Sequence, residues 1–212
     1  NLVDIMNVNQ KGVVVVLEDL KPIGIMTERD IVEILYKGVS LDEKIHKYTK
    51  KNLVSTIGGR TVGYALNLTL ENNIRRVIVV DDSNNFIGVV TQQDLLRYLE
   101  EDFYRLTIKV KHIIKKTGDL LSVSPHELLN DVLKIMVANK ISSVPVLEDG
   151  KPIGIISEKD ILKLAGKNIL LESAVSKYMN SPVDTARLDS LLVEGVEVMN
   201  YKNIRRVVIV DD

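Results

Sequence analysis

Residues 14–31 read VVVLEDLKPIGIMTERDI, and residues 144–161 read VPVLEDGKPIGIISEKDI. Thirteen of these 18 aligned positions are identical at a constant offset of 130 residues. The same offset aligns Ile74-Arg75-Arg76-Val77 with Ile204-Arg205-Arg206-Val207. The chain of 212 residues therefore contains a duplicated segment of about 130 residues, and such a repeat must be recognised before any other feature is interpreted.

A weaker repeat divides the duplicated segment into halves of about 65 residues. Gly24, Gly88 and Gly154 each begin the pattern Gly-apolar-apolar-[Ser/Thr]-x-x-Asp. We therefore divide the chain into four copies, which span residues 1–38, 41–103, 106–166 and 170–212. The first copy lacks the beginning of the pattern and the fourth lacks its end, so we expect the natural protein to extend further on both sides.

The third copy predicts the order strand–helix–strand–strand–helix, an α/β arrangement. The apolar runs 120–123, 144–147 and 152–156 are typical of strands, and Glu148-Asp149-Gly150-Lys151 predicts a turn between the last two. Apolar residues at helical spacing predict a helix that begins at Ser124-Pro125, and a second helix opens at Ser157. Because one copy has too few residues for a large core, we expect the copies to pair through their sheets.

The composition excludes several classes of protein. The chain is 45% apolar, has a formal net charge of −1 and contains no Cys. The near-zero charge argues against a nucleic-acid-binding protein, and the absence of Cys excludes disulfides and thiolate chemistry. Apolar runs are far shorter than the roughly 20 residues that span a bilayer, and no signal peptide is evident. We find no nucleophile–base pattern and no metal-ligand spacing, and we expect a cytoplasmic protein that is not an enzyme.

The Gly-apolar-apolar-[Ser/Thr]-x-x-Asp pattern has two interpretations. In the first, the hydroxyl residue caps a helix and the Asp lies in its first turn; the pairs are Thr27/Asp30, Thr91/Asp94 and Ser157/Asp160. In the second, the same helix N-terminus accepts a phosphate, the Asp accepts hydrogen bonds from ribose hydroxyls, and the glycine lets a ligand approach the strand. The two interpretations are compatible.

The arginine pairs Arg75-Arg76 and Arg205-Arg206 each precede an apolar strand. They are either surface charges that flank a strand or bidentate donors to phosphate oxygens. They occur only in copies two and four, since copies one and three have Gly12-Val13 and Ser142-Ser143 at these positions. This asymmetry favours pairs of copies in which one offers a pocket and the other supplies the charge.

The repeated unit resembles the cystathionine-β-synthase (CBS) domain. The resemblance rests on Ile-x-x-Val-Pro-Val at 141–146 and Gly-Ile-Ile-Ser-Glu-Lys-Asp at 154–160, and it covers nearly the whole chain. It implies tandem CBS domains paired into two Bateman modules, which pack as a flat disc in the gamma subunit of AMP-activated protein kinase. It also implies clefts that bind adenosyl ligands such as AMP, ADP, ATP or S-adenosylmethionine.

Carried over position by position, the resemblance assigns a role to each matching residue. Ribose would be held by Asp30, Asp94 and Asp160, and ribose or phosphate by Thr27, Thr91 and Ser157. Adenine would be enclosed by Ile74, Ile141, Val54, Leu121, Val89 and Ile155. Ser142, Ser143 and Pro145 would lie against the ligand in the third copy, the most complete of the four. Phosphate would be held by Arg205 and Arg206 in the third copy's cleft, and by Arg75 and Arg76 in the first copy's cleft.

The sequence thus predicts a regulatory sensor of adenine nucleotides, AMP before ADP or ATP, with no catalytic cofactor. The alternatives are a sensor of S-adenosylmethionine and a nucleic-acid-associated scaffold without a nucleotide site. A regulated protein partner is expected, a membrane is not, and nucleic acid is disfavoured. The expected assembly is a monomer or a homodimer.

Overall fold

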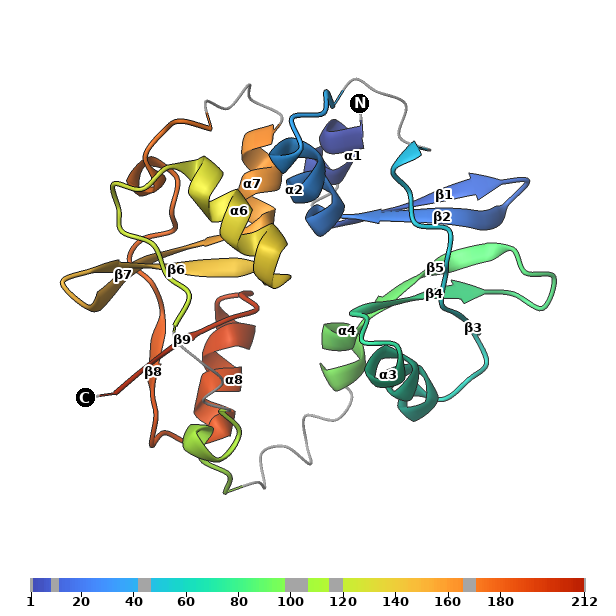
Figure 1. Cartoon of the computed structure of the whole chain (residues 1–212). Coiled ribbons are helices and arrows are strands. Elements are labelled where there is room, and N and C mark those ends of the chain that lie inside the picture. The colour runs from blue at the N-terminus through green and yellow to red at the C-terminus, as the bar shows by residue number, and fades with distance from the viewer. Residues whose placement is uncertain are drawn as a thin grey trace. The chain divides into compact units, whose positions relative to one another are not determined.

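The computed structural model describes residues 2–8, 12–41, 47–97, 107–114, 120–165 and 171–211 (Figure 1). The chain divides into two compact units. The first unit comprises Asn1–Gly12, Glu28–Glu43 and Leu106–Asp212, and the second comprises Val13–Thr27 and Lys44–Arg105. The first copy is therefore shared, because its hairpin belongs to the second unit and its helices belong to the first.

The second unit contains a two-stranded sheet and a three-stranded sheet. Its elements are β1 (Val13–Glu18), β2 (Lys21–Thr27), β3 (Ser55–Ile57), α3 (Val62–Glu71), β4 (Arg76–Val80), β5 (Phe86–Thr91) and α4 (Gln92–Arg97). The order β3-β4-β5 has β3 parallel and β5 antiparallel to β4. The backbone N–H of Phe86 donates to the carbonyl of Leu20 at 2.8 Å, which joins the β1–β2 turn to the start of β5.

The first unit contains the main hydrophobic core. Its elements are α1 (Leu2–Val8), α2 (Glu28–Tyr36), the 3-10 helix η2 (Val110–His112), α6 (Leu129–Asn139), β6 (Ser143–Glu148), β7 (Lys151–Ser157), α7 (Glu158–Ala165), η3 (Val175–Lys177), β8 (Thr185–Arg187), α8 (Leu192–Tyr201) and β9 (Val208–Val210). Helix α2 packs against α6 and α7, and its Val32 joins the core. In the part of the chain that the structure describes, no helix is long and apolar enough to cross a membrane.

Copies three and four are joined by their first residues. Lys109, near the start of the third copy, forms an antiparallel bridge with Leu191 of the fourth copy. Ala174, near the start of the fourth copy, forms the corresponding bridge with Leu128 of the third copy. This reciprocal pairing ties the two copies together by backbone hydrogen bonds, whereas pairing of the copies through their sheets stays a prediction.

The expected strand 120–123 is wrong, because only Val123 pairs, in a single parallel bridge with Val146. In the second copy, Ile78 N–H donates to Val54 O and Gly58 N–H donates to Val80 O, and these bonds extend the ladder on both sides. The third copy has Pro145 and Pro125 at the two donor positions. Since proline has no N–H, the ladder cannot continue in either direction.

The expected helix start at Ser124-Pro125 is also wrong, because α6 begins at Leu129. Residues 124–127 form a turn instead, in which Ser124 N–H donates to Glu127 Oε1 at 3.0 Å. The backbone of residues 127–129 is paired with the start of the fourth copy, since Val175 N–H donates to Glu127 O and Leu129 N–H donates to Ser173 O. These bonds hold 127–128 in an extended conformation and delay the helix.

Candidate functional site

The β6–β7 hairpin of the third copy has two chemically different faces, because successive residues in a strand point to opposite sides. One face has no exposed surface and belongs to the core; it carries Val144, Val146 and Ile156. The other face is half-buried and carries four of the predicted ligand residues, in the register Ser143 opposite Ser157 and Pro145 opposite Ile155. These four residues therefore share one surface.

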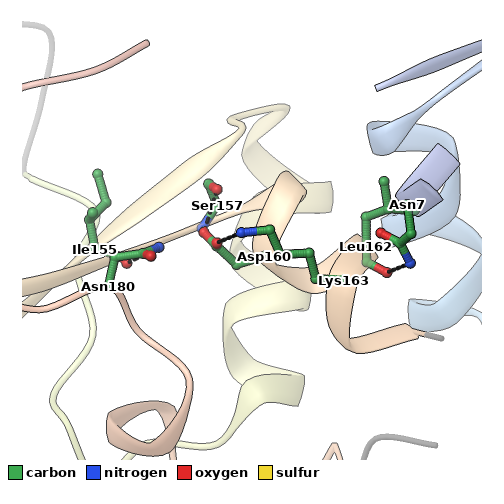
Figure 2. A network of polar contacts seen from close by, with 7 residues as sticks. All are labelled: Asn7, Ile155, Ser157, Asp160, Leu162, Lys163 and Asn180. Atoms are coloured by element: carbon green, nitrogen blue, oxygen red, sulfur yellow. Dashed lines mark hydrogen bonds and ion pairs between the residues drawn. The ribbon is translucent and has the colours of Figure 1, made fainter. Parts of the chain in front are cut away.

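Ser157 and Asp160 interact at the N-terminus of α7 (Figure 2). Asp160 Oδ2 accepts hydrogen bonds from the backbone N–H of Ser157 at 3.0 Å and from its hydroxyl at 2.5 Å. Asp160 thus lies in the first turn of α7, as the helix-start interpretation predicts, but the hydroxyl of Ser157 donates to this carboxylate. Asp160 Oδ1 lies 3.9 Å from Nζ of Lys163, a long ion pair that leaves this oxygen able to accept a further hydrogen bond. The side chain of Asp160 is only 11% exposed, so its carboxylate is held in place.

The third copy's Ser142 is contacted by the fourth copy. Nη2 of Arg206 donates a hydrogen bond to Oγ of Ser142 at 2.5 Å. Ser142 is buried, and its carbonyl accepts the backbone N–H of Glu158, the first residue of α7. One guanidinium of the arginine pair therefore lies next to the helix N-terminus that holds Asp160. The other, Arg205, is directed elsewhere: its Nη1 lies 3.6 Å from Oε2 of Glu28.

Of the predicted adenine-enclosing residues of the third copy, Ile155 lies on this surface, and Ile141 and Leu121 lie in the segments before β6 and Val123. Ile141 follows Lys140, which ends α6 in a left-handed conformation with φ of 54°. Its backbone N–H donates to Met136 O at 3.1 Å, and its half-buried side chain packs against the core. Leu121 is exposed and lies in the irregular segment before Val123.

The second copy repeats the motif with different neighbours. Asp94 Oδ2 accepts from the N–H of Thr91 at 2.9 Å and from its hydroxyl at 2.6 Å, and Asp94 N–H donates to Thr91 Oγ1 at 3.1 Å. Arg76 lies opposite Thr91 in the β4–β5 register, and the carbonyl of Arg75 accepts from Gln92 N–H. Here the arginine pair adjoins the copy's own motif.

The remaining predicted residues of the second copy line the same sheet. Val89 pairs with Ile78, whose side chain is buried, whereas Pro145 is half-buried at the equivalent place in the third copy. Val54 accepts the N–H of Ile78 at 3.0 Å, and Ile74 donates its N–H to Thr69 O at 2.9 Å. The second copy thus offers a more completely filled surface than the third.

The first copy's motif is divided between the two units. Thr27 is the last residue of β2, opposite Val13, in the second unit. Asp30 lies in the first turn of α2 in the first unit, where it is buried.

The interpretation that the motif glycine lets a ligand approach needs a correction at two of three positions. A Cβ built on Gly154 would lie 2.5 Å from Sδ of Met179, and one on Gly24 would lie 3.0 Å from Oγ1 of Thr49. The close approach is made by the chain itself, because Ile155 bridges to Asn180 and Ile25 to Lys50. Only Gly88, among the motif glycines, has open space around its Cβ position.

Sequence reasoning missed two buried carboxylates, Glu28 and Glu158. Each is the first residue of its helix and is 6% exposed. Arg29 Nε donates to Glu158 Oε1 at 2.9 Å. The signal was present, since both glutamates follow the motif hydroxyl in the repeated stretch, but a glutamate in a first helical turn is usually a solvent-exposed partner of the helix dipole.

The chain belongs to the CBS domain family. The model of the CBS domain matches residues 45–101 and 110–167, more than half of the chain. The protein MJ1225 of Methanocaldococcus jannaschii is 24% identical over 91% of this chain and 77% of its own length. Its crystal structure, for which homology to g-AMPK has been suggested, superposes with a TM-score of 0.88 over 100% of this chain and 85% of that one.

Two further comparisons differ in extent. The crystal structure of an uncharacterised conserved protein from Pyrococcus horikoshii has a TM-score of 0.63 at 20% identity and covers 94% of this chain and 82% of that chain. The inosine-5'-monophosphate dehydrogenase of M. jannaschii is 27% identical over 74% of this chain, which spans only 30% of that enzyme. The solved structures establish the shared fold of tandem CBS domains.

Proposed function

We propose that this chain is a regulatory module that binds an adenine nucleotide at the third copy, with AMP as the preferred ligand. One observation carries the proposal: Arg206 of the fourth copy contacts Ser142 beside the N-terminus of α7, where Ser157 and Asp160 are held together. A cation, a helix N-terminus and a fixed carboxylate are the groups that a nucleoside phosphate requires.

Each group has a place in this proposal. The carboxylate of Asp160 accepts the ribose hydroxyls through Oδ1, the oxygen not engaged by Ser157. The guanidinium groups of Arg206 and Arg205, with Ser142 and Ser143, bind the phosphate. The half-buried apolar residues Pro145, Ile155 and Ile141 contact the base. The second copy, with Thr91 and Asp94, is the next candidate site, and the first copy follows, with Thr27 and with Arg75 and Arg76 for the phosphate.

Isothermal titration calorimetry with AMP, ATP, adenosine and S-adenosylmethionine tests the proposal. Arg206→Ala should weaken AMP binding by about tenfold or more and leave adenosine unchanged, because a charge-assisted hydrogen bond contributes about 1.5–3 kcal/mol. Asp160→Asn should weaken the binding of AMP and of adenosine, each by about tenfold, since the amide can still cap α7 but replaces one ribose acceptor by a donor.

Lys163→Ala is the matched control, because Lys163 adjoins Asp160 at 3.9 Å and is mainly exposed. Its affinity for AMP should stay within about twofold of the wild type. Absence of AMP binding by the folded wild-type chain contradicts the proposal. Tighter binding of S-adenosylmethionine than of AMP favours the alternative ligand, and strongly salt-dependent binding of DNA or RNA favours the scaffold.

The regulatory role and the assembly belong to the same proposal. Ligand binding would regulate a protein partner in the cytoplasm rather than support catalysis, which requires that the ligand bind two states of the module with different affinities. The four copies at 1–38, 41–103, 106–166 and 170–212 are the proposed CBS units. Light scattering with and without AMP would distinguish the monomer from the homodimer.

A further inference from the structure

The carboxylate of Glu28 occupies a slot that only glycine can provide. Glu28 opens α2, and its backbone N–H donates to the carbonyl of Gly12 at 3.3 Å. A Cβ added to Gly12 would lie 2.3 Å from both the carboxyl carbon and Oε1 of Glu28. Any residue larger than glycine would therefore displace the carboxylate. The packing is specific, because the whole residue is only 6% exposed.

Glu28 faces one of the two arginines proposed for phosphate binding. Its Oε2 lies 3.6 Å from Nη1 of Arg205, whose own side chain is 45% exposed. Arg205 adjoins Arg206 in the chain, and Arg206 contacts Ser142 in the third copy. The arginine pair is thus split between a carboxylate of the first copy and a hydroxyl of the third copy.

The third copy shows what happens when the slot is absent. Its equivalent of Gly12 is Ser142, and its equivalent of Glu28 is Glu158, whose backbone N–H donates to Ser142 O at 3.1 Å. With a side chain at position 142, the carboxylate of Glu158 instead accepts from Nε of Arg29 at 2.9 Å. The glycine at position 12 therefore correlates with a carboxylate directed toward the arginine pair.

This inference rests on the proposed nucleotide site. We propose that Glu28 competes with the phosphate of the nucleotide for Arg205. Its carboxylate holds Arg205 in the absence of ligand, and a bound phosphate takes Arg205 over, because both anions present oxygens to the same guanidinium. The exchange withdraws a cation from a buried carboxylate at the start of α2. Since α2 packs against α6 and α7, occupancy of the site is transmitted to the helices of the first unit.

The test measures AMP and adenosine affinity by calorimetry in Glu28→Gln and in a control on the same helix. Glu28→Gln keeps the shape of the side chain beside Gly12 but removes its charge. AMP should therefore bind about threefold to tenfold more tightly than to the wild type, and adenosine should bind as it does to the wild type. Glu33→Gln removes an exposed carboxylate of α2 that pairs with Lys37 at 3.1 Å, and it should change neither affinity.

Two further variants make the result specific to Arg205. Glu28→Gln combined with Arg205→Gln should show none of the gain in AMP affinity, because the released cation is absent. Gly12→Ser reproduces the third copy and should expel the carboxylate, which gives a similar gain without altering Glu28. Unchanged AMP affinity in both Glu28→Gln and Gly12→Ser, or an equal gain for adenosine, overturns the inference alone. A folded wild type that binds neither AMP nor adenosine overturns the proposed function as well.

Discussion

The first and third copies contain nearly the same 18-residue stretch, yet the two stretches have different surroundings. Five positions differ: Val15/Pro145, Leu20/Gly150, Met26/Ile156, Thr27/Ser157 and Arg29/Lys159. Both stretches form a hairpin followed by a helix. The hairpin of the third copy lies in the same compact unit as its helix, whereas that of the first copy does not. The two stretches thus form the same local structure, whereas their tertiary contacts differ because they pack against different residues.

The ion pairs illustrate the difference. Arg29 of the first copy reaches Glu158 of the third, but Lys159, the equivalent of Arg29, is exposed, and Glu28 faces Arg205 instead. The duplication is thus broken by single-residue differences, at Arg29/Lys159 within the repeated stretch and at Gly12/Ser142 outside it. Three substitutions test this difference between the copies, in order of decreasing expected effect.

The largest effect is expected for Gly154→Ala. The new methyl group would overlap Met179 and lie 3.2 Å from the carbonyl oxygen of Asn180, a backbone atom that cannot move independently. We expect a loss of about 1–3 kcal/mol in the free energy of unfolding, measured by urea titration with circular dichroism. Gly88→Ala is the matched control, since its methyl group meets open space and should cost less than about 0.5 kcal/mol. Equal losses in the two variants would show that burial beneath the following segment is unimportant.

A smaller effect is expected for Arg29→Ala. Glu158 is almost fully buried, so removal of its partner leaves a poorly solvated carboxylate, but Arg29 is itself 41% exposed and its charge is screened. We expect destabilisation of about 1 kcal/mol, again from urea titration. Lys159→Ala alters the equivalent exposed residue of the third copy and should change stability by less than about 0.5 kcal/mol. If both variants lost the same stability, the asymmetry of the two copies would have no energetic meaning.

The smallest effect is expected for Leu20→Gly, and it has the opposite sign. Leu20 has φ of 66° in the two-residue turn between β1 and β2, a conformation that glycine adopts without strain, and the third copy has Gly150 there with φ of 76°. Relief of strain outweighs the added freedom of the unfolded chain, so we expect a gain of about 0.5 kcal/mol. Gly150→Leu should destabilise by about 1 kcal/mol. A destabilised Leu20→Gly variant would indicate that the leucine side chain makes a favourable contact.

Much of the fold was predictable from local pattern. The hairpin of residues 143–157, its turn at Asp149-Gly150 and the helix starts that follow Ser157 and Thr91 were all expected, because each depends on residues a few positions apart. The strand at 120–123 and the helix start at Ser124 were predicted wrongly. Both errors arise from pairing with distant backbone, at Pro145 in one case and at residues 173–175 in the other.

The candidate site shows the same division. The family resemblance assigned ligand contacts to Ser143, Pro145, Ile155 and Ser157, and the strand register of the structure brings these four residues onto one face. It did not reveal that Arg206 and Arg205 point to different partners, or that Met179 covers Gly154.

The sequence alone predicted the fourfold repeat, the hairpin and following helix of the third copy, and the helix start at Thr91. These depend on spacing along the chain, where hydrogen bonds and hydrophobic periodicity act over a few residues. Only the tertiary structure decided which arginine meets a carboxylate, which glycine is covered and which linker pairs with which copy. Those contacts join residues that are tens to hundreds of positions apart in the chain. They are selected by packing and by side-chain volume where the segments touch, as the missing Cβ of Gly12 illustrates.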